Sequence, residues 1–175
     1  KTNTITVTLT DQQNQTVASL SWNYDAPALI GSSDNATLDV TKGESSQTLS
    51  EGFYTMLGNR SEENNEQTDF ILIYDNSGTI RSEIPIISYR SCRLLFNGDT
   101  MSYSISSSKI ATMKQTGQII AIYDSDQYRL HHDYINGSHN DLLVLASKAN
   151  SETEEDLIIS IDRDNGEIDE LIDLK

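Results

Sequence analysis

The sequence lacks several features on which whole classes of protein depend. It has one cysteine, Cys92, so no disulfide can form within the chain, and it has only two prolines. Its longest apolar stretches, such as residues 142–146, are far shorter than the roughly 20 residues of a membrane helix. We therefore expect no membrane span. We interpret Cys92 as a small buried residue rather than a nucleophile, because free cysteines are commonly buried.

Basic residues are scarce as well. The chain carries 12 lysines and arginines against 27 aspartates and glutamates, which gives a formal net charge of −15. An acidic surface repels phosphate backbones, and the sequence has no basic cluster that could release counterions from nucleic acid. The composition argues against a nucleic-acid partner and against binding to anionic membranes.

What the sequence does contain is alternation of apolar and polar residues with a period of two, which predicts strands rather than amphipathic helices. Residues 4–10 and 18–24 both alternate in this way, and the polar stretch 11–15 between them predicts a hairpin. Shorter apolar segments follow at 38–40 and 53–57. We predict an all-β protein whose first part is a β-sandwich-like domain.

The segment 59–67 is polar throughout and has no periodicity, which is typical of a solvated linker or long loop. Beyond it, isoleucine, leucine and tyrosine become denser. We place the domain boundary at this segment, with an N-terminal β-sandwich-like domain over residues 1–64 and a second domain over residues 68–175.

The second domain contains a repeat. Segments 71–80, 110–119 and 158–168 each predict a strand, a tight turn with glycine and a second strand, and they recur at the spacing of about 40–50 residues that is typical of propeller blades. A second element, built around Asn-Gly, occurs in 94–104 and again in 134–147.

Each repeat unit therefore holds four strands, as a propeller blade does. The second domain has room for about two such blades, whereas a closed propeller needs roughly four to eight. We predict an incomplete β-propeller, with the first part of the chain as a separate sandwich.

All three histidines lie in the short segment 128–139. His131, His132 and Asp133 fall at the start of the innermost strand predicted for the second blade, and inner strands line the central channel of a propeller. In a regular strand His131 and Asp133 share one face and His132 lies on the other. These three residues are the candidate catalytic residues, and His139 is expected to be solvated in a turn.

Other interpretations of this motif stay open at this stage. The cluster is also typical of a hydrogen-bonded strand end, or of part of a metal site, although adjacent histidines in a strand diverge and ligate one ion poorly. The turn 162–167 resembles part of a calcium loop but lacks its spacing and its bidentate glutamate. We predict neither a metal nor a cofactor. Arg90, Arg93 and Arg129 could reach an anionic group, although arginines in so acidic a chain usually pair with surface carboxylates.

The motif from His131 through Asn136-Gly137 and the following repeat to Asp173 resembles a blade of the bacterial arylsulfate sulfotransferases, which use no nucleotide sulfate donor. The earlier units at 71–78 and 97–99 are similar to earlier blades of that family. The resemblance is clear over about residues 69–175 and rests on position and strand pattern before that. It implies an N-terminal β-domain followed by the early blades of a six-bladed propeller.

The resemblance also implies a function. Enzymes of this family transfer a sulfuryl group from a phenolic sulfate ester to a phenol acceptor through a sulfated histidine, which in this comparison lies outside the chain. His131 or His132 would then bind sulfuryl oxygens or act as an acid or base. The chain would be an N-terminal part of such an enzyme, inactive or nearly so alone, and exported or surface-associated in a bacterium.

The alternative is a non-catalytic extracellular β-rich module that binds a glycan or a protein. An enzyme needs an imidazole that faces the channel beside a cationic group, whereas a binding module does not. Under either hypothesis, incomplete blades leave strand edges exposed, and exposed edges favour a homo-oligomer.

Overall fold

The computed structural model describes residues 2–25, 51–58, 69–91, 93–152 and 157–174. Within these ranges every regular element is a strand, which confirms the all-β prediction. The strands are β1 (Thr2–Thr10), β2 (Thr16–Asp25), β3 (Phe53–Gly58), β4 (Asp69–Asp75), β5 (Ile80–Ile86), β6 (Leu94–Asn97), β7 (Thr100–Ser106), β8 (Lys109–Lys114), β9 (Ile119–Asp124), β10 (Tyr128–Asn136), β11 (Asp141–Lys148), β12 (Leu157–Asp162) and β13 (Ile168–Asp173).

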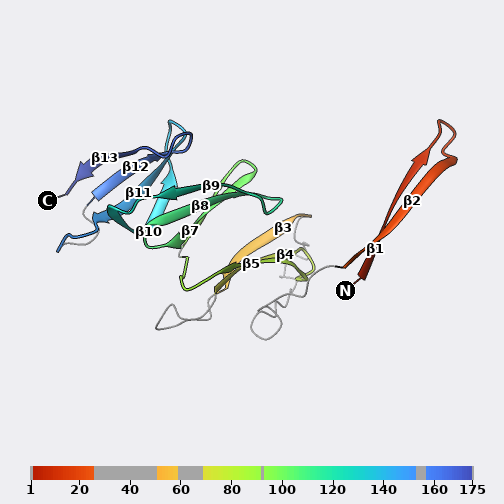
Figure 1. The fold of residues 1–175 in the computed structure, drawn as a ribbon, viewed down its shortest axis with the longest axis horizontal. Helices are drawn as coiled ribbons and strands as arrows, with labels where there is room; N and C mark the ends of the chain where they lie inside the picture. The colour runs from red at the N-terminus through yellow and green to blue at the C-terminus, as the bar shows by residue number, and fades with distance from the viewer. Residues whose placement is uncertain (1, 26–50, 59–68, 92, 153–156, 175) are drawn as a thin grey trace, which may run out of the picture.

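These strands form four antiparallel sheets in which neighbours in sequence are neighbours in space: β1–β2, β3–β5, β6–β9 and β10–β13. The last three sheets follow one another across the molecule, while the β1–β2 hairpin extends away from them (Figure 1). The two four-stranded sheets confirm the repeat unit that the Asn-Gly and glycine-turn elements predict. No helix in the described ranges is long and apolar enough to cross a membrane.

The hairpin of β1 and β2 has the register that the alternation predicts. Ile5 pairs with Trp22 and Val7 with Leu20, so apolar side chains share one face, and threonine and serine hydroxyls bond across the other. Every residue of both strands is exposed, however, with Leu20 at 66%. The expected strands at 38–40 that would complete a sandwich lie outside the described residues, as do the linker 59–67 and Cys92.

β3 lies before the domain boundary that the sequence predicts, and it hydrogen-bonds to β4, which lies after it. The pairing runs over the whole strand, from Phe53 opposite Asp75 to Gly58 opposite Phe70. The segment 53–57, expected in the first domain, is therefore the edge strand of the β3–β5 sheet. β3 reads FYTMLG and does not alternate as β1 does, and its sequence alone does not specify which neighbour it joins.

Two apolar cores hold the three sheets together. The first lies between β3–β5 and β6–β9 and is built around Ile71, Met101 and Met113. The second lies between β6–β9 and β10–β13, where Val144 and Ile159 are fully buried. Burial of apolar surface at about 25 cal/mol per Å² makes these contacts between sheets the main favourable term in the stability of this region.

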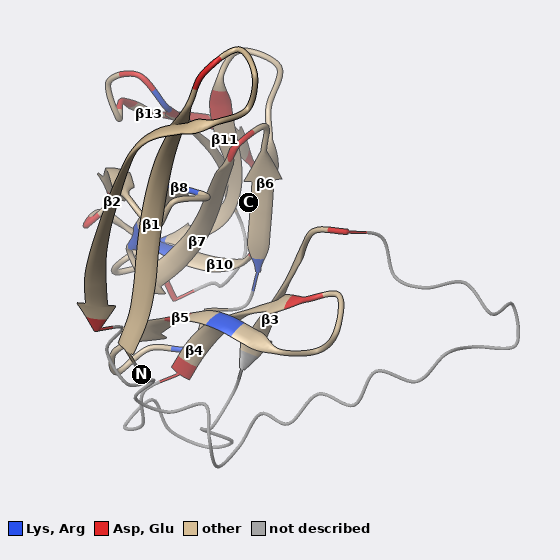
Figure 2. Cartoon of the chain, turned by 90° about the vertical axis from the view of Figure 1, so that its right-hand side faces the viewer, with Lys and Arg blue, Asp and Glu red and all other residues tan. Residues whose placement is uncertain are grey.

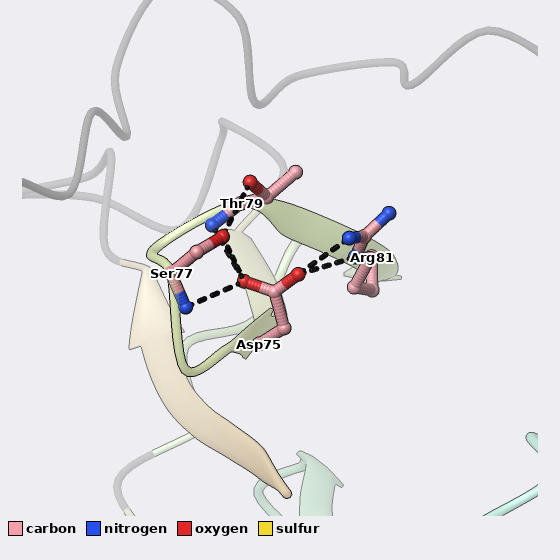
Figure 3. A network of polar contacts seen from close by, with 4 residues as sticks. All are labelled: Asp75, Ser77, Thr79 and Arg81. Atoms are coloured by element: carbon pink, nitrogen blue, oxygen red, sulfur yellow. Dashed lines mark hydrogen bonds and ion pairs between the residues drawn. The ribbon is translucent and has the colours of Figure 1, made fainter. Parts of the chain in front are cut away.

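The turns between paired strands explain why the sequence folds into hairpins. One carboxylate oxygen of Asp75 accepts hydrogen bonds from the amides of Ser77 and Thr79 at 2.9 and 3.0 Å, and from the Ser77 hydroxyl at 2.6 Å (Figure 3). Arg81 binds the other oxygen at 2.7 Å. The Ser77 hydroxyl above all, and then Arg81 and the turn amides, hold the pKa of Asp75 well below its ordinary value. Gly78 supplies the positive φ of 81° that the turn requires.

The same chemistry recurs in the β12–β13 turn, where Asp162 accepts hydrogen bonds from the amides of Asp164 and Asn165. Asp75 and Asp162 therefore both bind amides of their own turns. The Asn136-Gly137 turn differs from the expected glycine turn, because Asn140 and not Gly137 has positive φ. A Cβ atom at position 137 would lie 2.2 Å from the Asp141 carboxylate, so a larger residue there would have to displace that side chain.

Candidate functional site

The His131-His132-Asp133 motif lies inside β10, at an irregularity in its pairing with β11. Leu130 pairs with Ala146 and Tyr134 pairs with Val144, so three residues of β10 lie opposite one residue of β11. Such a bulge bends a strand and redirects side chains. The regular alternation expected for His131 and Asp133 is therefore interrupted, and the motif lies within the strand rather than at its start.

Buried residues on both sides of the bulge hold it in place. Leu130 and Tyr134 are buried in the core between the two four-stranded sheets, at 5% and 2% exposure. The Tyr134 hydroxyl donates a hydrogen bond to the Arg93 carbonyl at 2.5 Å and accepts one from the Ser104 amide at 3.2 Å. The backbone on either side of the motif is thus held firmly against the neighbouring sheet.

His131 is half-buried, and its Nε2 lies 2.8 Å from the hydroxyl of Ser147 on β11. Ser147 itself is buried, at 2% exposure. A serine hydroxyl can donate or accept a hydrogen bond, so this contact is compatible with either tautomer of the ring and with its protonated form. The contact orients the imidazole without fixing its charge.

Asp133 forms an ion pair with Arg93, which precedes β6 in the neighbouring sheet. Both side chains are partly exposed, at 60% and 41%. The expectation that Arg93 pairs with a carboxylate is confirmed. This pair places a guanidinium next to the motif, two positions along β10 from His131. His132 is exposed on the same strand.

A second polar group ties the end of β10 to the other strands. Arg163, in the β12–β13 turn, donates hydrogen bonds to Asn136 at 2.5 Å and to the Ser102 hydroxyl at 3.3 Å. Asn136 in turn donates to the Phe96 carbonyl of β6 at 2.9 Å. Burial lowers the pKa of the Arg163 guanidinium, and its Nε is buried without a hydrogen-bond partner among the described residues. The first strands of the two sheets, β6 and β10, are therefore hydrogen-bonded to each other beyond the C-terminal end of the motif.

His139 lies exposed in the β10–β11 turn, where its Nδ1 contacts the Ser138 hydroxyl at 2.9 Å. It takes no part in the arrangement around His131. Among the described residues no group of three histidine, cysteine or acidic side chains is placed to hold a metal ion. Acidic residues gather mainly at turns and strand ends, while the strands β1 and β2 carry almost no charge (Figure 2).

The comparison with protein families shows the family to which the chain belongs. The model of the arylsulfotransferase (ASST) family matches residues 39–175, which is more than half of the chain. The chain belongs to the arylsulfotransferase family. Neither the curated proteins nor the solved structures gave a significant match. The family resemblance expected from the β10 motif and its flanking repeats is confirmed, and it assigns the chain to a sulfotransferase type of enzyme family.

Within this arylsulfotransferase chain the sequence indicated His131, His132, Asp133 and Arg93, and the structure brings Asp133 and Arg93 together. It did not indicate Ser147 or Arg163, because their contacts cross from one strand or sheet to another. The one available signal for Arg163 is its place directly after Asp162, in a turn whose ends are fixed.

Proposed function

We propose that this chain is an N-terminal part of an aryl-sulfate sulfotransferase and that its two four-stranded sheets are propeller blades. Three features support the proposal: the family match, the order β6–β9 and β10–β13 within each sheet, and the packing of consecutive sheets through one apolar core. In this arrangement β6 and β10 are the inner strands. A closed propeller of about four to eight blades then requires further sheets beside these.

The reaction that fits the family is sulfuryl transfer from a phenolic sulfate ester to a phenol. A histidine nitrogen attacks sulfur, the sulfur–oxygen bond to the aryl group breaks, and the leaving phenoxide takes up a proton. The acceptor phenol oxygen then attacks the same sulfur, the sulfur–nitrogen bond breaks, and the phenol proton is lost. We assign the sulfated histidine to a position outside this chain, as the resemblance implies.

His131 supplies the acid or base in this scheme. Histidine is the side chain whose charge changes most readily near neutral pH, so it can protonate a leaving phenoxide or accept the proton of a phenol. The observation that carries this role is the contact with Ser147, because it orients the His131 ring through a partner that tolerates both of its protonation states.

Asp133 and Arg93 act as positioning residues. Their ion pair joins β10 to the segment that enters β6, next to the bulge that carries both histidines. The guanidinium provides the cationic neighbour that sulfuryl oxygens need, and guanidinium groups recognise oxyanions well. His132 lies within the same bulge and is a second candidate for contact with sulfuryl oxygens.

The location and assembly of the protein are part of the same proposal. We place the enzyme outside the cytoplasm, secreted, periplasmic or on the surface of a bacterium, in line with the resemblance. We also expect this chain to self-associate through its outer strands, because β13 exposes Leu171 and Ile172 at 52% and 46%. A clean monomer at high concentration in size-exclusion chromatography would count against that expectation.

The test of function is acceptor-dependent transfer from a chromogenic aryl sulfate to added phenol. It compares this chain, the complete polypeptide that carries it, and His131→Ala and His132→Ala variants of that polypeptide. His139→Ala is the matched control, because His139 lies in the adjacent turn. We expect turnover by the complete polypeptide, a loss of about 10²–10⁴-fold in the His131 variant, partial rescue by added imidazole, and no loss in the control.

No turnover by a folded complete polypeptide would favour the alternative, a non-catalytic module that binds a glycan or protein. Equal losses of turnover in the His131 and His139 variants would contradict a specific role for His131 as the acid or base. Rescue by imidazole also distinguishes a lost acid or base from a folding defect in the His131 variant, because imidazole replaces the missing group and does not repair a misfolded strand.

A further inference from the structure

A cavity of about 270 Å³ lies between the β3–β5 sheet and the β6–β9 sheet, away from the bulge in β10. The lining side chains come from β3, β4, β6, β7 and β8 and from the residues next to β3 and β8: Gly52, Phe53, Thr55, Ile73, Phe96, Met101, Met113, Lys114 and Gln115. Its volume is near the lower limit for small-molecule sites, which suits one or two fused rings.

The apolar lining consists mainly of phenylalanine and methionine. Met101 and Met113 are buried at 5% and 3% exposure, whereas Phe53 and Phe96 are 71% and 52% exposed. Two exposed phenylalanines beside a buried methionine floor leave aromatic surface in water that a flat ring would cover. Thioether sulfur also makes favourable contacts with aromatic rings, and methionine adapts to the shape of its partner.

The charged side chain that lines the cavity is basic, whereas the chain as a whole is acidic. Lys114 is the single charged residue among those that line it, although acidic residues outnumber basic ones by 27 to 12 overall. The Lys114 backbone is anchored by its turn, since its amide donates to the Gln118 carbonyl at 2.9 Å and its carbonyl accepts from the Gly117 amide at 2.9 Å. An anionic group on the ligand would meet this lysine without an acidic neighbour in the lining.

We propose that this cavity binds a flat aromatic anion, with the ring against Phe96 and the two methionines and the anionic group toward Lys114. The lining holds no cysteine, histidine or carboxylate, and we assign it binding and no chemistry. It lies on other strands than His131 and His132. The inference therefore goes beyond the proposed sulfuryl transfer and stands or falls separately from it.

The test uses the three methionines as reporters. We would label their methyl groups with carbon-13 and titrate the 175-residue chain with 2-naphthalenesulfonate, whose sulfur is bonded to carbon and is not transferred. Ring currents should shift the Met101 and Met113 methyl signals. Met56 should stay unchanged, because it follows the lining residue Thr55 on β3 and points to the opposite face of the sheet.

Variants then separate the two parts of the site. Phe96→Ala should weaken binding of 2-naphthalenesulfonate at least tenfold. Lys114→Gln should weaken it severalfold while leaving binding of the neutral 2-naphthalenemethanol unchanged. Lys109→Gln is the matched control at the other end of β8, where Lys109 pairs with Asp124, and it should bind as the parent does. Far-ultraviolet circular dichroism checks that each variant keeps its strands.

Saturation without any shift at Met101 and Met113 would overturn the proposal, and so would the absence of binding at millimolar concentration. Equal weakening by the Lys114 and Lys109 variants would contradict the role of Lys114, because the loss would then reflect only the change in the net charge of the chain. Binding of cyclohexanesulfonate as tight as that of the aromatic anion would contradict the proposed preference for an aromatic ring.

Discussion

The β1–β2 hairpin and the β10–β13 sheet are both built of antiparallel strands and differ in what covers them. Apolar residues alternate with polar ones in the hairpin, whereas β11 and β12 contain the continuous apolar runs 142–146 and 157–159. In the sheet, Val144 and Ile159 are fully buried against β6–β9, whereas Val7 and Leu20 of the hairpin are 57% and 66% exposed. Alternation therefore specifies the two strands of the hairpin and their register, but the stability of a strand comes from a second layer packed against it.

The largest expected difference between the two regions is in the free energy of unfolding after removal of an apolar side chain. Ile159→Ala should destabilise the protein by about 2–5 kcal/mol, because it leaves a cavity between two packed sheets. Leu20→Ala in the hairpin should change stability by less than about 0.5 kcal/mol, as exposed positions do. Urea unfolding of both variants measures this contrast, and similar costs at the two sites would break the comparison.

A smaller effect is expected at the hydrogen bonds that join the sheets. Tyr134→Phe removes the hydroxyl that bonds to the Arg93 carbonyl and the Ser104 amide, and it should cost about 1–3 kcal/mol because the amide loses this acceptor and the carbonyl loses the shorter of its bonds from the Tyr134 and Ser91 hydroxyls. Tyr128→Phe is the control, since its hydroxyl bonds to the exposed Glu170. An equal and small change in both variants would mean that the Tyr134 contact does not hold β10 against its neighbour.

A pH effect sharpens the comparison at the turns. Asp11 in the hairpin and Asp75 in the β4–β5 turn both bind turn amides, but Asp75 also binds the Ser77 hydroxyl and Arg81. The pKa of Asp75 lies below its ordinary value of 3.8. Its contribution to stability is therefore complete above that value and is lost as the pH falls toward the lower pKa of the folded state.

Asp75→Asn should accordingly reduce the loss of stability on acidification below the ordinary carboxyl range, and Arg81→Gln should reduce it in part. Urea midpoints between pH 7 and pH 2 measure the change. A variant that loses stability on acidification as steeply as the parent would show that the Asp75 turn does not contribute to the pH dependence.

Local sequence signals account for most of the hairpins. Asp75 and Gly78 predict the β4–β5 turn, and the same reasoning holds for Asp162 and Gly166, because turn amides and positive φ depend on neighbouring residues only. These signals also position the candidate histidines on β10. The domain limits predicted at 1–64 and 68–175 stay a prediction, with β3 paired across the segment between them.

The parts that could not be predicted depend on residues far apart in the sequence. The bulge around His131 arises from the register of β10 against β11, and Leu130 and Tyr134 keep their buried positions only because three residues lie between them. The contact of His131 with Ser147 follows from that register. Arg163 likewise reaches Ser102 only after two sheets have packed. No local pattern encodes these distances.

Hydrogen exchange measured amide by amide tests the central contrast most directly. We predict that amides of β11 and β12 exchange only through global unfolding, because both strands lie inside a four-stranded sheet packed on a core. The amides of β1 and β2 should exchange far faster, through local opening of a two-stranded hairpin. Protection of the hairpin equal to that of β11 and β12 would contradict the account.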